Sequence, residues 1–188
     1  MKQSFRPNVD IALVHYPVSN KKGDIVASAV TNLDLHDIAR AGRTFGVNAY
    51  YVVTPLHDQQ ILVDRIVSHW TTGEGGRLNP ARREALQLIR IKDSLEDVVS
   101  EIQQRDNGTP KVVVTSAKIH GEGMSFESLR KQLQDGIPYL LTFGTAWGLS
   151  DDVMTRADYT LDPISGGTDY NHLSVRSAVS IILDRLLS

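Results

Sequence analysis

The side chains best suited to acid–base chemistry lie together in one short run, Asp169-Tyr170-Asn171-His172. A carboxylate or an imidazole there could remove or stabilise a proton during a reaction, and residue type alone does not favour either. The amide of Asn171 could hold a flat polar partner through two hydrogen bonds. Asp and Asn are also common in turns that lead into a helix, so the run has a purely structural explanation as well.

Two predicted strands lie upstream of this run, and each is followed by a loop. Leu140–Phe143 is an apolar stretch of strand length that Gly144 ends, and Tyr159–Leu161 is a second stretch that Asp162-Pro163 ends. In open sheets of parallel strands, ligands bind in the loops that follow the carboxyl ends of the strands. The last quarter of the chain is therefore the expected ligand site.

A helix is predicted directly after the polar run. Apolar side chains recur there at helical spacing, at Val175, Ala178, Val179, Ile182, Leu183 and Leu186. Ser174 stands where a side chain would accept a hydrogen bond from the first helical turn, so it is the expected N-cap.

Strands and helices alternate through the rest of the chain. Predicted strands cover residues 9–16, 49–54, 87–92 and 111–115, and predicted helices cover residues 35–45, 59–70, 81–86, 95–104 and 125–134. The alternation predicts an α/β fold in which an open, mostly parallel sheet carries helices on both faces, in a single domain spanning residues 1–188. Asp34 is the expected cap of the first helix with Asp37 at the capping-box position, and residues 71–80 are expected to form the most flexible loop.

Bulk composition limits the function classes. The chain has 188 residues, no cysteine, six histidines without metal-ligand spacing and a net charge of -2. These features predict no disulfide, no thiol nucleophile and no metal. The N-terminus lacks the apolar core of a signal peptide, and no apolar run approaches the ~18 residues that span a bilayer, so a cytoplasmic protein is expected. Because the chain has no overall positive charge, nucleic acid would have to bind to a local basic patch or through a partner chain.

Three segments in the last quarter carry a family resemblance: Gly144-Thr145-Ala146-Trp147-Gly148-Leu149-Ser150, Pro163-Ile164-Ser165-Gly166 and His172-Leu173-Ser174-Val175-Arg176-Ser177-Ala178. In this order, and before a final helix, they resemble the closing motifs of SPOUT-superfamily (α/β-knot) RNA methyltransferases. The chain looks closest to the stand-alone bacterial members. The resemblance implies a C-terminal trefoil knot at about residues 111–188 that binds S-adenosylmethionine (SAM), with S-adenosylhomocysteine as the product.

The resemblance also implies where the cofactor lies. In the family the adenine sits among apolar side chains and is read mainly by backbone groups, so small residues must let the backbone approach closely. Three loops, following the strands that end near residues 115, 143 and 161, are expected to converge on it. The expected cofactor-binding residues are Thr115, Ser116, Phe143, Gly144, Thr145, Gly148, Leu149, Leu161, Pro163, Ile164, Gly166, Leu173, Ser174 and Ala178.

A second motif lies in the first predicted helix, where Arg40 precedes Phe45-Gly46-Val47 by five residues. This spacing resembles the family's N-terminal motif, whose arginine works near the acceptor nucleotide, often across a dimer interface. The resemblance therefore implies a homodimer in which Arg40 lies near the partner's loop at residues 166–172. A solvated arginine on a helix face is the alternative explanation. The expected catalytic residues are Arg40, Asp169, Asn171 and His172.

The chain departs from the family pattern at three positions. Thr145 or Ala146 stands where the pattern has an acidic residue, His172 replaces a serine, and Ser174 replaces an asparagine. The departures leave the cofactor-binding backbone in place, but they put a direct transfer of ribose 2′-O-methylation in doubt.

The predicted function is SAM-dependent methylation of RNA, with tRNA or rRNA as the expected substrate. One alternative is a non-catalytic SAM-binding knot protein that acts as a partner or regulatory module. Another alternative is a nucleotide-binding protein with an ordinary doubly wound sheet. The absence of the glycine-rich motifs G-x-G-x-x-G and G-x-x-x-x-G-K-S/T argues against it. RNA would meet basic side chains in or beside loops, and scattered surface charge is the alternative for each of them: Lys21, Lys22, Arg77, Arg82, Arg83, Lys118 and His120.

Overall fold

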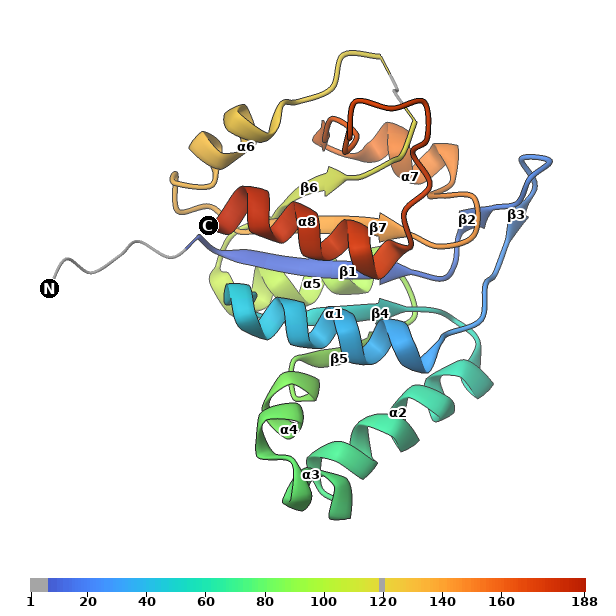
Figure 1. The fold of residues 1–188 in the computed structure, drawn as a ribbon, viewed down its shortest axis with the longest axis vertical. Helices are drawn as coiled ribbons and strands as arrows, with labels where there is room; N and C mark the ends of the chain where they lie inside the picture. Colours follow the sequence, from blue (N-terminus) through green and yellow to red (C-terminus); the bar gives the residue numbers. More distant parts are fainter. Residues whose placement is uncertain (1–6, 119–120) are drawn as a thin grey trace, which may run out of the picture.

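The computed structural model describes residues 7–118 and 121–188, and within them one parallel sheet of six strands forms the centre of the molecule (Figure 1). The order across the sheet is β5-β4-β1-β7-β6-β8, and every adjacent pair is parallel. All carboxyl ends therefore lie along one side, which we name the carboxyl edge; the opposite side is the amino edge. The strands are β1 (Val9–Val14), β4 (Tyr50–Val53), β5 (Ile89–Lys92), β6 (Lys111–Val114), β7 (Tyr139–Gly144) and β8 (Tyr159–Thr160).

The pairing of β1 with β7 is the longest in this sheet and joins segments 130 residues apart in sequence. It runs in register from Val9 opposite Tyr139 to Val14 opposite Gly144. Both strands are almost fully buried, which explains why they read as continuous apolar runs rather than as alternating ones.

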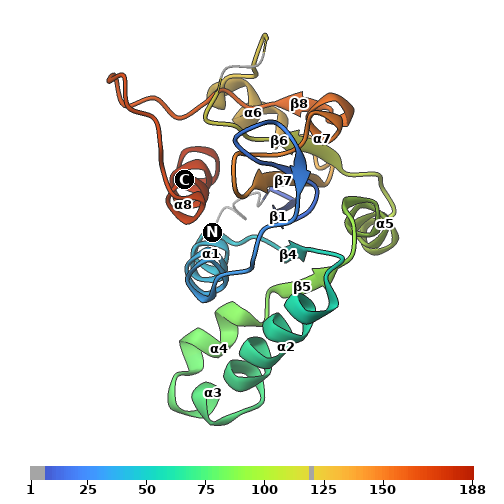
Figure 2. The same ribbon diagram turned by 90° about the vertical axis from the view of Figure 1, so that its right-hand side faces the viewer.

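Helices cover both faces of the sheet, as the sequence predicts (Figure 2). One face packs against α1 (Asn32–Phe45), α6 (Phe126–Gln132) and α8 (Val175–Leu187), and the other against α5 (Leu95–Asp106) and α7 (Asp151–Arg156). A separate group beside α1 consists of α2 (His57–Thr71), α3 (Glu74–Leu78) and α4 (Pro80–Leu86). Within the described part of the chain, no helix combines the length and the apolar character that a membrane crossing requires.

A small antiparallel hairpin projects at the carboxyl edge (Figure 1). It consists of β2 (Val18–Ser19) and β3 (Ile25–Val26), joined by a polar turn. The side-chain oxygen of Asn20 accepts hydrogen bonds from the backbone N–H groups of Lys22 and Asp24, at 2.8 and 3.0 Å, which stabilises the turn.

The start of α1 corrects one prediction. The N-cap is Thr31, not Asp34, because the Thr31 hydroxyl oxygen accepts the Asp34 backbone N–H at 3.2 Å. Asp34 lies in the third helical position, and its carboxylate accepts the Thr31 hydroxyl, so the capping box starts three residues earlier than predicted. The predicted cap Ser174 is confirmed, and Ser94 and Ser125 cap α5 and α6 in the same way.

The glycine-rich segment 71–80 is not the open loop that its composition suggests. It contains α3, and Gly75 and Gly76 are buried. A Cβ atom at Gly76 would overlap the carbonyl oxygen of Trp70, and one at Gly75 would lie 2.7 Å from the His69 ring. These glycines are therefore required by close packing against α2. The helix α7 was also not predicted.

We expect Gly76→Ala to lower the free energy of unfolding by about 1–3 kcal/mol, because the added methyl group forces backbone apart in a packed site. Urea denaturation measures the change. Gly166→Ala is the matched control, because a Cβ atom there meets nothing within 4 Å; its effect should stay within about 0.5 kcal/mol. Equal effects of the two substitutions would show that the segment around Gly76 is not tightly packed.

Candidate functional site

Two of the three predicted loops meet at the carboxyl edge. The loop after β6 pairs with the end of β8, since the Met124 N–H donates to the Thr160 carbonyl at 2.7 Å and the Asp162 N–H donates to the Met124 carbonyl at 2.9 Å. Further along, the Asn171 amide donates to the Ala117 carbonyl at 3.0 Å. Segments about 40–55 residues apart in sequence are thus brought together around residues 161–171.

The third loop, after β7, is braced against the hairpin rather than against the other two loops. The Gly148 N–H donates to the Thr145 carbonyl at 2.9 Å, which closes a tight turn, with Ala146 at φ 52° and Gly148 at φ 111°. The Trp147 N–H donates to the Ser19 carbonyl at 3.1 Å, and the Ser19 N–H donates to the Gly148 carbonyl at 2.9 Å. The turn is therefore held at both ends.

The glycines expected to approach a cofactor divide into two kinds. A Cβ atom at Gly144 would lie 2.5 Å from the Leu149 nitrogen, so this glycine is needed for the loop to fold back on itself. A Cβ atom at Gly148, Gly166 or Gly167 would meet nothing within 4 Å. Gly148 belongs to the turn that is bonded to the hairpin, whereas Gly166 and Gly167 lie in the exposed segment after β8. This second pair is the better candidate for contact with a bound molecule.

Thr145 is engaged in a buried polar network below the loop. Its hydroxyl donates to the Val14 carbonyl at 2.9 Å and lies 2.5 Å from the Ser28 hydroxyl. The Ser28 hydroxyl in turn lies 3.0 Å from Nδ1 of His15. Burial lowers the pKa of His15 to about 4, despite the opposing charge of Asp34, so the imidazole is neutral at pH 7. The network fixes the exit of β7 relative to β1.

The remaining cofactor candidates range from core to surface. Phe143, Leu149 and Leu161 belong to the hydrophobic core. The hydroxyl of Thr115 donates to the Thr142 carbonyl at 3.0 Å, and that of Ser174 caps α8 by accepting the Ser177 N–H. The others lie at the surface of the carboxyl edge, half-buried at Ser116, Pro163, Ile164 and Ala178 and exposed at Leu173.

The expected catalytic residues are only partly brought together. Asp169, Asn171 and His172 are exposed in the segment before α8. Arg40 is exposed on α1, six residues and so about 9 Å further along the helix axis than Asp34, which contacts the first turn of α8. In the described part of the chain, no recorded contact joins Arg40 to the segment before α8.

Sequence reasoning missed Arg176, which links the two helices at the site. Its guanidinium lies 3.4 Å from the Asp34 carboxylate and 3.5 Å from the Asp37 carboxylate. The sequence does contain two acidic residues one turn apart on α1, which could bind a cation together. It gives no indication of their partner, because Arg176 is some 140 residues away. The arginine holds the start of α8 against α1.

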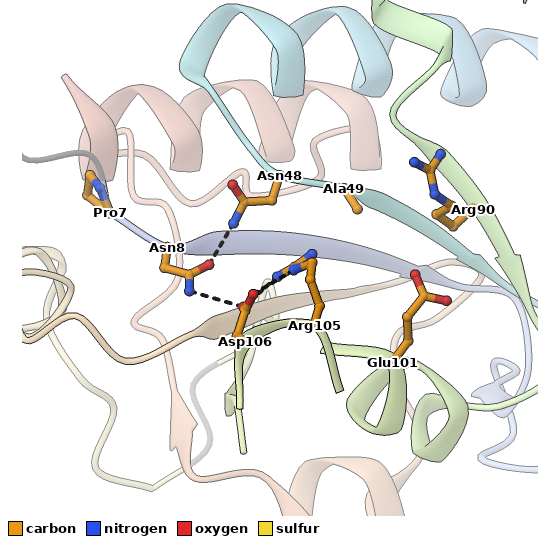
Figure 3. A pocket seen from close by; sticks show the side chains of 8 residues that line it. All are labelled: Pro7, Asn8, Asn48, Ala49, Arg90, Glu101, Arg105 and Asp106. Atoms are coloured by element: carbon orange, nitrogen blue, oxygen red, sulfur yellow. Dashed lines mark hydrogen bonds and ion pairs between the residues drawn. The ribbon is translucent and has the colours of Figure 1, made fainter. Parts of the chain in front are cut away.

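A polar hollow of about 480 Å³ lies at the amino edge, away from these loops (Figure 3). Arg105 of α5 contacts the buried Asp10 carboxylate through two hydrogen bonds, at 2.9 and 2.6 Å, and also pairs with Asp106. A buried carboxylate requires such a partner. Because its charged groups satisfy one another, the hollow has the features of a structural ion-pair cluster rather than of a reactive site.

The predicted basic surface is dispersed. Arg77 pairs with Glu74, and the Arg82 guanidinium lies 4.6 Å from the ring centroid of Trp70. Lys21, Lys22, Arg83 and Lys118 are exposed, and His120 lies outside the described residues. Among the described residues, no group of three or more His, Asp or Glu side chains is placed to hold a metal ion.

Comparison with known proteins identifies relatives. A family model described as "SAM-dependent RNA methyltransferase" matches residues 8–188. The chain is 48% identical over 180 residues to a protein of Oleidesulfovibrio alaskensis named tRNA (guanine-N(1)-)-methyltransferase, covering 96% of this chain and 42% of that protein. It is 42% identical over 182 residues to an uncharacterized protein of Aquifex aeolicus, covering 96% of this chain and 89% of that protein. The chain thus spans less than half of the first relative and most of the second.

Solved structures of low sequence identity share the fold. The A. aeolicus TrmH/SpoU tRNA modifying enzyme superposes with a TM-score of 0.57 at 16% identity, covering 96% of this chain and 74% of that one. The SpoU methyltransferase AviRb from Streptomyces viridochromogenes, in complex with AdoMet, gives a TM-score of 0.55 at 18% identity, covering 97% and 58%.

The buried imidazole predicts an acid-sensitive fold. The unfolded chain takes up a proton on His15 near pH 6.5, whereas the folded chain does so only near pH 4. Stability attributable to this residue is therefore intact above pH 6.5 and is lost as the pH falls towards 4, by about 3 kcal/mol in total. Urea denaturation at several pH values should show a steeper loss for the parent than for His15→Gln. Parallel pH profiles would mean that folding does not shift the pKa of His15.

Proposed function

The chain belongs to the family of SAM-dependent RNA methyltransferases, and from this membership we propose that it methylates a nucleotide of tRNA at the carboxyl edge of its sheet. The observation that carries the proposal is the meeting of the loops after β6 and β8 beside the start of α8. tRNA is proposed because two relatives are named tRNA methyltransferases. Because this chain spans only 42% of the length of each of these relatives, the atom that it methylates has to be identified by analysing the methylated tRNA. A tRNA substrate agrees with action in the cytoplasm.

We further propose that residues 1–188 act as one SPOUT-type domain, with a trefoil knot formed by about residues 111–188. The motif order supports this, as does the pairing of Met124 with residues 160–162, which closes a loop beside the segment that leads to α8.

The residues at the carboxyl edge fit S-adenosylmethionine. The open space beside Gly166 and Gly167 allows a flat adenosine to approach the backbone, and half-buried Pro163 and Ile164 precede it. When bound, the cofactor supplies an electrophilic methyl group on its sulfonium. We assign the binding surface to the exposed and half-buried members of the predicted set, and we assign a supporting role to Phe143, Gly144, Thr145, Leu149 and Leu161.

Residues of the chain would act mainly on the acceptor. Asp169 or His172 would take the proton that the acceptor loses, and Asn171 would lie beside the base. Arg40 would hold a phosphate or a developing negative charge with its guanidinium. Holding the acceptor in line with the methyl group is the main contribution to the rate.

The exposure of Arg40 favours a site shared between two chains. Because Arg40 is exposed on α1, and no contact among the described residues joins it to residues 169–172, we propose a homodimer in which each Arg40 enters the partner's site. One chain then provides the cofactor loops and the other provides the arginine.

Gly166→Val tests the cofactor surface. The new side chain has room in the free protein, so the melting temperature should stay unchanged, whereas SAM affinity measured by calorimetry should fall roughly tenfold or more because the side chain fills the space of the ligand. Unchanged affinity would show that the adenosine binds elsewhere.

Arg40→Ala tests the acceptor side. We expect single-turnover transfer of labelled methyl to tRNA from a strain lacking this protein to fall about 30- to 1,000-fold, because a transition-state contact is lost. SAM binding should persist. The control is Arg43→Ala, one turn further along α1, where the guanidinium already contacts Glu84; its rate should stay within about threefold of the parent, as expected away from the site.

Mixing the two defective proteins tests the shared site. Re-equilibrated Arg40→Ala and Gly166→Val chains should regain roughly a quarter of the parent activity, because half of the dimers would be mixed and each would hold one intact site. No recovery, with both single variants inactive and mixed dimers shown by mass spectrometry, would place both residues in the same chain's site. Absence of transfer by the parent protein would contradict the proposed function itself.

A further inference from the structure

Three large aromatic side chains remain exposed at the carboxyl edge. Tyr16 follows β1, Trp147 follows β7 and Tyr170 follows β8, with 41%, 59% and 72% of their surfaces accessible. Every other tyrosine and tryptophan of the chain is buried or half-buried. Single exposed apolar residues are common on proteins. Among residues 7–118 and 121–188, however, the exposed Phe, Tyr and Trp side chains are these three, all at the carboxyl edge, which favours a ligand that stacks on flat rings.

Trp147 is presented by a rigid support. It lies at the third position of the turn closed by Thr145 and Gly148, and its backbone N–H is bonded to Ser19. That bond joins its loop to the short segment that follows Tyr16, so the supports of the two rings are physically connected. A ring held by its backbone loses little conformational freedom on binding, which suits it to act as a platform.

Tyr170 is also held in a braced segment. Its ring meets the His172 ring edge-on, with centroids 6.4 Å apart. Its backbone N–H donates to the Thr168 hydroxyl at 3.3 Å, and the neighbouring Asn171 is tied to the loop after β6. The ring therefore stands beside the polar groups proposed to act on the acceptor.

The charge of this edge distinguishes stacking from phosphate binding. Lys21, Lys22 and Lys118 are exposed there, but so are Asp169 and Glu122, and the whole chain carries a net charge of -2. A surface of mixed charge gains little from counterion release. Stacking of a base on an aromatic ring neutralises no phosphate, so this part of the binding does not depend on counterion release. The bases must be unpaired, because only then are their faces exposed.

We propose that Tyr16, Trp147 and Tyr170 form a stacking surface for unpaired RNA bases that flank the nucleotide to be methylated. This inference rests on the proposed function, because it assumes RNA as the ligand. It adds a selection rule: the enzyme takes its target from a single-stranded loop or end, and recognises it through the faces of neighbouring bases.

Tryptophan fluorescence tests the proposal directly. The chain has two tryptophans, so Trp70→Phe leaves Trp147 as the only one. Titration with a single-stranded oligoadenylate should quench its emission. An abasic strand of equal length, with the same phosphates, and an RNA duplex of equal length should both quench far less.

Affinity variants complete the test. Measured by anisotropy of the labelled oligoadenylate, Trp147→Ala should bind about 5- to 100-fold more weakly, whereas Trp147→Phe should recover most of the affinity. SAM affinity, measured by calorimetry, should not change. Tyr16→Ala and Tyr170→Ala should show smaller losses of the same kind.

Several results would overturn the stacking surface. Equal binding of the abasic strand would show phosphate recognition, and unchanged Trp147 emission at saturating oligoadenylate would show that the bases do not reach this ring. Equal loss of SAM affinity in Trp147→Ala would assign the ring to the cofactor site. Normal methyl transfer to tRNA by Trp147→Ala, with unchanged binding of oligoadenylate, would reject stacking while leaving the proposed function intact.

Discussion

The parallel pairing of β1 with β7 is the constraint on which the rest of the structure depends. It joins the first strand of the chain to a strand 130 residues later over six consecutive positions, at the centre of the sheet. Only with this register does the Thr145 hydroxyl reach the Val14 carbonyl, and only then does the buried contact with Ser28 and His15 form. The turn that presents Trp147 is fixed by the same pairing. Because the contacts are so distant in sequence, they must form late and at a high entropic cost.

The order of the strands explains why the site has no local signature. β7 lies between β1 and β6, so three loops from different parts of the chain reach one edge. The helices are also held by a contact between segments distant in sequence, because Arg176 at the start of α8 pairs with Asp34 and Asp37 of α1. Arg40 of α1 is not joined to this assembly by any contact among the described residues, and the proposed homodimer would bring it there from a second subunit.

Local patterns predicted what local physics determines. Hydrophobic patterns located the six strands, and Ser174 marked the start of α8 because a hydroxyl cap acts within four residues. Predictions failed where the local structure is determined by contact with another segment of the chain. The glycines at 75 and 76 suggested a flexible loop, yet the packing of α2 requires them. The pairing of Asp10 with Arg105 across 95 positions gave no sequence signal at all.

The central claim is that S-adenosylmethionine binds at the carboxyl edge, and amide hydrogen exchange with and without the cofactor tests it most directly. The account predicts slower exchange in residues 163–167, at the Trp147 turn and in the first turn of α8. It predicts no change around Asn8 and Arg105, which line the hollow at the amino edge. Protection of the amino edge with none at residues 163–167 would contradict the account.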